Sequence, residues 1–110
     1  MKLRMRNNSI RLRLTRGEVA QFSETGHIEE KVTFLSGALH YMLTRSPASN
    51  LTADLTGTTL IVHVPEEQAD RWATTNQVAM EAQHGSLGIL IEKDFQCTHG
   101  PQDPDAFAPA

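Results

Sequence analysis

The sequence has only one cysteine, Cys97, and therefore no disulfide can form within the chain. It also lacks any apolar run near the roughly 18 residues that a membrane-spanning helix needs. Arginines interrupt every apolar stretch near the start, which argues against a secretory signal. These absences predict a cytoplasmic protein that has no membrane partner.

Aromatic residues are scarce at 5%, while hydrophobic residues make up 39% of the 110-residue chain and charged residues 21%. Such a composition is typical of one small globular domain. The net charge of −3 is unevenly distributed: residues 1–50 carry eight basic and four acidic groups, and residues 51–110 carry two and nine. This split indicates either an anionic partner for the first half or contact between the two halves.

Residues 2–6 and 10–14 alternate polar and apolar side chains, which is the period of a half-buried strand. Asn7 and Asn8 stand between these segments, and asparagine tolerates the positive φ of a tight turn. Residues 2–15 therefore predict a β-hairpin.

A short helix is predicted directly after this hairpin. Thr15 and Glu18 have the spacing of a capping box, and Gly26 is a typical residue for the helix end. Residues 27–35 and 38–44 then alternate again, and they predict a second hairpin.

The second half of the chain has the same order of elements. They are strands at 51–56 and 59–64, a helix from Pro65 through Trp72, and strands at 77–82 and 87–92. When the chain is shifted by about 50 residues, the apolar positions of 3–28 fall on apolar positions of the second half, and no gap is needed. Val19 then falls on Ala69 and Phe22 on Trp72. We therefore predict two ββαββ repeats.

Each repeat is too small to bury a core alone, so the two are expected to share one. We predict a mainly β fold with two short helices, in which interleaved hairpins close a swapped-hairpin-like barrel with a pseudo-two-fold axis. The predicted domain covers 1–94, with repeat one at 1–46 and repeat two at 51–94. Residues 95–110 are predicted to form a flexible acidic tail.

The first half resembles the AbrB/MazE family. The resemblance rests on Asn8-Ser9, on the strand Leu12-Arg13-Leu14, and on Thr15 where a proline often stands. It implies a swapped-hairpin barrel, which two identical chains normally build, and DNA binding by the first hairpin. The whole chain, with NSIRLRLT near one end and IEKDF before Cys97 near the other, also resembles a small bacterial family of unknown function.

The AbrB/MazE resemblance implies specific nucleic-acid contacts. The matched candidates are Arg4, Asn8, Ser9 and Arg13, and the additional basic groups on the same outward face are Arg6 and Arg11. Arginine forks suit phosphate oxygens and guanine edges. At the four arginine positions, the second repeat has Asp54, Thr56, Ile61 and His63. One basic hairpin contacts few phosphates, so binding would be weak and salt-sensitive.

Two explanations of the arginines remain open. Outward positions of a half-buried strand are usually charged, and acids such as Glu29 or those of the second half would then neutralise them. Like charges that face each other across a hairpin destabilise it by some tenths of a kcal/mol per pair. An outside anion is the alternative source of compensation.

The end of the chain offers a different kind of partner site. Phe95 and Phe107 stand among aspartates, a pattern similar to the acidic tail with which MazE-like antitoxins wrap a toxin. A protein-interaction module is therefore the alternative to nucleic-acid binding. The other reading is that both phenylalanines fold back onto the barrel.

No nucleophile elbow or phosphate loop occurs, and we expect a non-enzymatic protein without a cofactor. Cys97 and His99 fall short of the four ligands of a structural zinc site, so no metal is expected.

Glu30 shares the parity of core-facing residues, which indicates either a functional carboxylate or a position at the barrel rim. A ligand site or active site in the barrel mouth is a weaker alternative, and the oligomeric state is left open.

Overall fold

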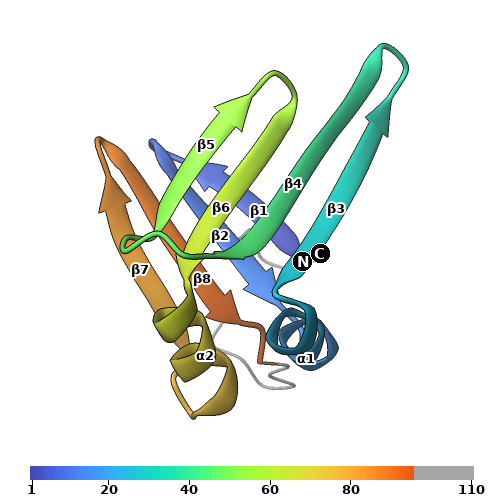
Figure 1. The fold of residues 1–110 in the computed structure, drawn as a ribbon. Coiled ribbons are helices and arrows are strands. Elements are labelled where there is room, and N and C mark those ends of the chain that lie inside the picture. Colours follow the sequence, from blue (N-terminus) through green and yellow to red (C-terminus); the bar gives the residue numbers. More distant parts are fainter. Residues whose placement is uncertain (96–110) are drawn as a thin grey trace, which may run out of the picture.

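The computed structural model describes residues 1–95. Its elements are β1 (Lys2–Arg6), β2 (Ser9–Leu14), α1 (Arg16–Thr25), β3 (His27–Phe34), β4 (Gly37–Ser46), β5 (Thr52–Thr56), β6 (Thr59–Pro65), α2 (Glu66–Thr74), β7 (Ala79–His84) and β8 (Leu87–Lys93). This order confirms the predicted mainly β fold with two short helices. The helices lie at one end of the molecule and the hairpin turns at the other (Figure 1). Neither helix within 1–95 is long and apolar enough to cross a membrane.

The strands form two four-stranded sheets, with the orders β1-β2-β8-β7 and β3-β4-β6-β5. Each sheet therefore contains one hairpin from each half of the chain. The halves meet along two parallel strand pairs, β2 with β8 and β4 with β6. The hairpins are interleaved as predicted, and each half completes the sheets of the other.

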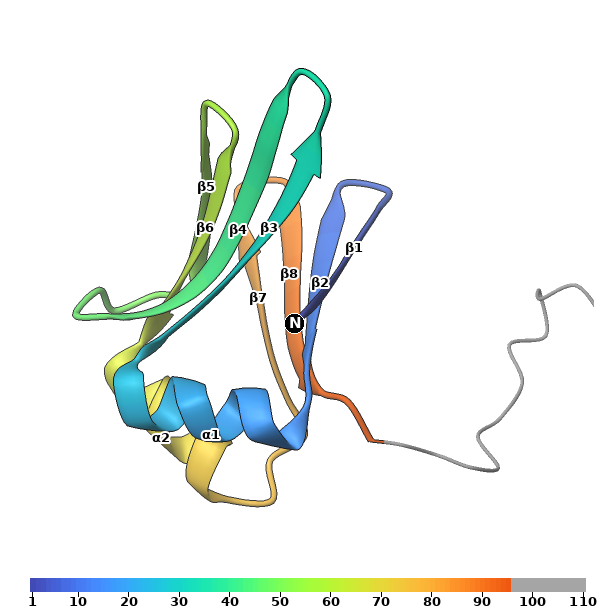
Figure 2. The same cartoon turned by 90° about the vertical axis from the view of Figure 1, so that its right-hand side faces the viewer.

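The predicted closure into one barrel is wrong, because the strands remain in two separate sheets. The sheets move apart toward the hairpin turns (Figure 2), and inward-facing side chains at that end, such as Met5 and Leu55, are exposed. Where β5 and β7 of the two sheets approach each other, they form no strand ladder, and a side chain makes the contact. The ring nitrogen Nδ1 of His84 on β7 lies 3.2 Å from the backbone N of Ala53 on β5. Alternation along a strand is the same in a barrel and in a pair of sheets, so it does not predict closure.

The core lies between the sheets and over the helices. The largest fully buried side chains are Trp72, Phe22, Leu12, Leu14, Leu43, Met80, Ile91, Val62 and Val64. Phe22 of α1 and Trp72 of α2 meet edge to face, with ring centroids 6.2 Å apart. These two residues occupy the corresponding positions that the repeat predicted, and their contact joins the two halves.

The first hairpin turn and the two ends of α1 form as their local sequence predicts. Asn7 and Asn8 both have positive φ, at 48° and 59°, which is the pattern of a tight two-residue hairpin turn. Thr15 and Glu18 form the complete capping box of α1. Gly26 ends the helix in the left-handed region, with φ 74°.

The second repeat departs from the first after its helix. Ile28 is buried, whereas its counterpart Val78 is 48% exposed. The strand β3 begins at His27, which corresponds to Gln77, but β7 begins only at Ala79. The backbone oxygen of Val78 accepts hydrogen bonds from Trp72 Nε1 and from the Lys93 backbone N, both at 3.0 Å. These bonds hold the Val78 backbone inward while its side chain points outward.

Candidate anion-binding face and neighbouring cleft

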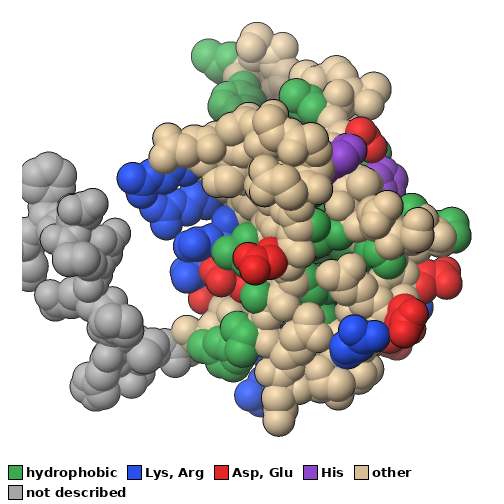
Figure 3. Space-filling view, turned by 90° about the vertical axis from the view of Figure 1, so that its left-hand side faces the viewer, with side chains coloured by type: hydrophobic (Ala, Val, Ile, Leu, Met, Phe, Trp, Pro, Cys, Tyr) green, Lys and Arg blue, Asp and Glu red, His purple; other side chains and the backbone are tan. Residues whose placement is uncertain are grey.

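The outward positions of β1 and β2 form a basic face, which we define as Lys2, Arg4, Arg6, Arg11 and Arg13. The antiparallel register places Lys2 opposite Arg13 and Arg4 opposite Arg11. The inward positions of the same strands are Leu3, Met5, Ile10, Leu12 and Leu14, which gives the hairpin one apolar and one cationic side. Lys and Arg side chains gather on one side of the molecule, with carboxylates beside them (Figure 3).

Acids of the second half neutralise part of the basic face. The parallel register of β2 and β8 places Glu92 beside Arg13. Its Oε1 accepts a hydrogen bond from Arg13 Nε at 2.6 Å and lies 3.5 Å from Arg11 Nε. Lys2 Nζ donates to Asp94 at 3.1 Å. The hydrogen bond that Arg13 donates to Glu92 raises the pKa of the Arg13 guanidinium.

Arg4 and Arg6 differ from their neighbours on this face. Both are exposed on β1, which is an edge strand of its sheet. Within residues 1–95, neither makes an ion pair, and Arg4 stands opposite another cation, Arg11. The positive charge of the face is therefore least compensated along its outer edge.

The other two predicted contact residues bind within the chain. Asn8 Nδ2 donates to the backbone oxygen of Ser86 at 2.7 Å and reaches its hydroxyl at 3.0 Å. Ser9 Oγ donates to the Arg6 backbone oxygen at 2.5 Å. These contacts stabilise the β1–β2 turn and tie it to the β7–β8 turn.

Glu30 belongs to a separate polar cluster around the amino group of Met1. This ammonium contacts Glu18 and lies 2.8 Å from Glu30 Oε1, and the hydroxyl of Tyr41 donates to the Met1 backbone oxygen at 2.9 Å. Burial favours the neutral amine, but the two carboxylates outweigh it and raise the pKa of the Met1 amino group. Burial would raise the pKa of Glu18, but the Met1 ammonium and bonds from Thr15 lower it. No sequence pattern indicated this cluster.

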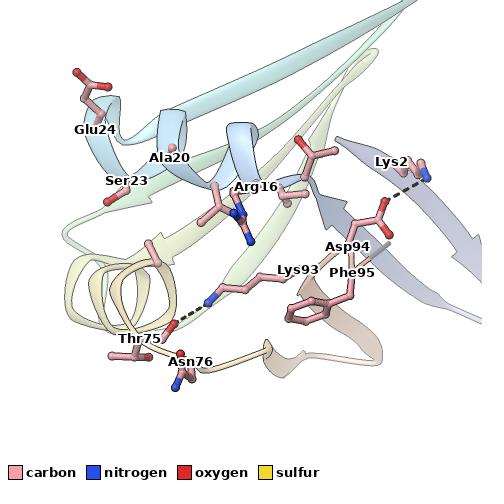
Figure 4. A pocket seen from close by; sticks show the side chains of 14 residues that line it. Lys2, Arg16, Ala20, Ser23, Glu24, Thr75, Asn76, Lys93, Asp94 and Phe95 are labelled. Atoms are coloured by element: carbon pink, nitrogen blue, oxygen red, sulfur yellow. Dashed lines mark hydrogen bonds and ion pairs between the residues drawn. The ribbon is translucent and has the colours of Figure 1, made fainter. Parts of the chain in front are cut away.

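A cleft of about 1390 Å³ lies between α1, α2 and the end of β8. Arg16 and Lys93 extend into it, and Phe95 stands at its edge (Figure 4). Lys93 Nζ donates to the Thr75 backbone oxygen at 2.8 Å. Phe95 is 65% exposed. The cleft is at the helical end, away from the hairpin turns, and Phe107, Cys97 and His99 lie outside the described residues.

The fold and the basic face together define a small two-sheet protein with a cationic outer surface on β1 and β2. The chain belongs to DUF7009, a family of unknown function whose model matches residues 1–108. This confirms the predicted membership of a small family of unknown function. No curated protein and no solved structure matches the chain. The resemblance to the AbrB/MazE family stays a prediction.

Proposed function

We propose that this chain is a non-enzymatic cytoplasmic binding module whose basic face binds the phosphate backbone of a nucleic acid. One observation carries the proposal. Arg4 and Arg6 are exposed on an edge strand and make no ion pair within residues 1–95, and Arg4 faces Arg11 in the ladder. Like charges opposite each other destabilise a hairpin, so an anion on this face would stabilise it.

Arginine side chains suit phosphate in particular. The planar guanidinium donates two parallel hydrogen bonds to a phosphate, and its positive charge strengthens both. Release of counterions from nucleic acid adds a favourable term for each phosphate that is neutralised. Backbone contacts carry no sequence information directly. Because Asn8 and Ser9 already bind within the chain, we expect weak sequence preference.

The interleaved hairpins support the AbrB/MazE resemblance, since such a barrel exchanges hairpins between its two halves. In this chain one half supplies the basic hairpin, while the corresponding β5–β6 hairpin carries Asp54 and His63 on its outward side. A single basic hairpin predicts few phosphate contacts, and therefore weak binding whose log–log dependence on salt has a slope of only about −0.9 for each phosphate neutralised.

The test is fluorescence anisotropy with a labelled DNA duplex at about 50 and 200 mM salt. We expect binding at the lower salt and about tenfold weaker binding by Arg4→Ala/Arg6→Ala, because each lost phosphate contact removes counterion release. Arg16→Ala/Arg71→Ala removes the same charge elsewhere and is the matched control. Absence of binding by the wild type at the lower salt would overturn the proposal.

Docking of a protein partner at the cleft is a second candidate. It is favoured by Phe95, which is 65% exposed beside two cations, Arg16 and Lys93. Aromatic side chains and arginine are enriched at the centres of protein interfaces. If Phe95→Ala leaves the set of co-purifying proteins unchanged, this candidate is eliminated.

A further inference from the structure

We infer that Glu92 is a built-in competitor that occupies Arg11 and Arg13 in place of a partner's phosphate. The inference rests on the proposed function and concerns how the same face is regulated. It divides the face into two zones. The outer zone is Arg4 and Arg6, and the inner zone is Arg11 and Arg13, with Lys2 opposite Arg13 and paired with Asp94.

The position of Glu92 is set by the sheet. It lies on β8, beside Arg13 in the parallel register, and its side chain is 18% exposed. A single carboxylate oxygen, Oε1, faces Arg13 Nε at 2.6 Å and Arg11 Nε at 3.5 Å. A phosphate that binds either guanidinium from its Nε side would compete with Glu92 for the same donor, because carboxylate and phosphate form the same charge-assisted hydrogen bonds with arginine.

Competition follows from the ladder that holds β8. The Glu92 backbone is hydrogen-bonded between β2 and β7, so the carboxylate cannot leave the face when a partner arrives. A phosphate that approaches the inner zone must displace this side chain and then remains near its negative charge. The outer zone has no such competitor within residues 1–95, so we expect a partner to bind there first.

The same face indicates which nucleic acid it fits. The outward positions of this sheet are Lys2, Arg4, Arg6, Ser9, Arg11, Arg13, Ala79, Glu81, Gln83, Gly88, Leu90 and Glu92. None is aromatic, and single-stranded nucleic acids are bound largely by bases stacking on aromatic side chains. The partner is therefore the backbone of a duplex.

The experiment compares Glu92→Gln with Glu81→Gln in the anisotropy assay. Glu81 is an exposed carboxylate on the same outward face, next to Leu90 in the register, so both variants change the charge equally. We expect Glu92→Gln to bind duplex DNA about three- to tenfold more tightly, as the loss of two partly exposed ion pairs predicts. Its salt dependence should steepen by about one to two in log–log slope. The control should change affinity less than about twofold, because it frees no arginine.

A double-mutant cycle separates local competition from general repulsion. In an Arg11→Ala/Arg13→Ala background, Glu92→Gln should lose its effect. The same gain in this background, or an equal gain from Glu81→Gln, would overturn the inference while the proposed function stands. If the wild type does not bind the duplex at the lower salt, the proposed function itself fails. Equal or tighter binding of a single strand would overturn the assignment of a duplex.

Thermal unfolding of each variant provides the check on folding. Removal of a partly exposed ion pair costs little stability, so Glu92→Gln is expected to unfold within a few degrees of the wild type. Glu92→Asp serves as the second variant. It keeps the charge on a shorter side chain, and we expect its affinity to lie between those of the wild type and Glu92→Gln.

Discussion

Glu18 shows how one carboxylate serves two structures that are far apart in the sequence. It accepts a hydrogen bond from the Thr15 backbone in the capping box, and it contacts the Met1 ammonium together with Glu30. Buried charges cost free energy unless they are paired. Glu30 shares the core-facing parity of its strand, but its side chain is 39% exposed and pairs with the Met1 ammonium, so this carboxylate keeps both solvent and a partner.

Glu18→Gln should lower the melting temperature at neutral pH, and the difference from the wild type should depend on pH. The pKa of Glu18 is lowered, so its stabilisation is present above its ordinary value and is lost as pH falls through the folded value. The pKa of the Met1 amino group is raised, so its stabilisation is complete below its ordinary value and is lost as pH rises through the folded value.

The measurement is a series of thermal unfolding curves from about pH 3 to pH 10, a range that begins below the ordinary pKa of a glutamate and ends above that of an amino terminus. The difference between the wild type and Glu18→Gln should be largest near neutral pH and should shrink toward both ends. Glu24→Gln, an exposed position on the same helix, is the control and should run parallel to the wild type. A constant difference between the wild type and Glu18→Gln across the range would contradict the assigned ion pair.

At the scale of elements, α1 has stronger terminal signals than α2. The first helix has a complete capping box and a left-handed C-cap at Gly26, whereas Pro65 before α2 makes no side-chain cap bond. Two acidic residues in the first turn of α2, Glu66 and Glu67, favour the positive end of its dipole. The start of α1 is therefore stabilised by hydrogen bonds of its capping residues, whereas the start of α2 is stabilised by acidic side chains near the helix dipole.

Removal of the cap tests its contribution to α1. Thr15→Ala should lower the free energy of unfolding by about 1 kcal/mol, because it leaves an amide of the first turn without its acceptor. Urea denaturation measures the loss. Ser23→Ala removes a hydroxyl within the same helix and should change stability by less than about 0.5 kcal/mol. A Thr15→Ala variant as stable as the wild type would show that the cap contributes nothing.

Replacement by alanine of the two glycines at opposite ends of α1 should change the free energy of unfolding in opposite directions. Gly26 has φ +74°, and an added Cβ would lie 3.4 Å from Arg45 Cβ, so Gly26→Ala should destabilise by about 1 kcal/mol or more. Gly17 lies within the helix and has open space around it, so Gly17→Ala should stabilise by up to about 1 kcal/mol. Chemical denaturation of both variants checks the signs, and a shared sign would contradict this account.

At the scale of the whole molecule, neither half of the chain contains a complete sheet. Each sheet joins a hairpin of one half to a hairpin of the other. The helices of the two halves also contact each other, through Phe22 of α1 and Trp72 of α2. A half of this size also buries too little surface to be stable alone. The two repeats therefore depend on each other for folding.

Separate expression of 1–50 and 51–110 tests this dependence. Neither piece should be folded as a monomer, and an equimolar mixture should recover β structure and a cooperative unfolding transition. Circular dichroism measures the recovery, and light scattering after size exclusion gives the stoichiometry. A folded monomer of either half would show that the interleaved sheets are not required.

Most elements were predictable because their signals are local. Alternation placed β1 and β2, the capping box placed the start of α1, and Gly26 placed its end. The offset of the repeats predicted which hairpins are equivalent. The outward direction of the arginines was also predictable, since it follows from the parity of their strands. The exposure of Val78 was not, because it depends on how the segment after α2 meets Trp72 and Lys93.

The sequence by itself determined the order of the elements, the apolar side of each strand and the basic face. Only the tertiary structure decided that the sheets stay separate and that Glu92 meets Arg13 across 79 residues of chain. The physical reason is that periodicity records which side of a strand is buried, whereas strand pairing and register depend on contacts between distant segments. The acid beside Arg11 and Arg13 is therefore a property of the assembled sheet.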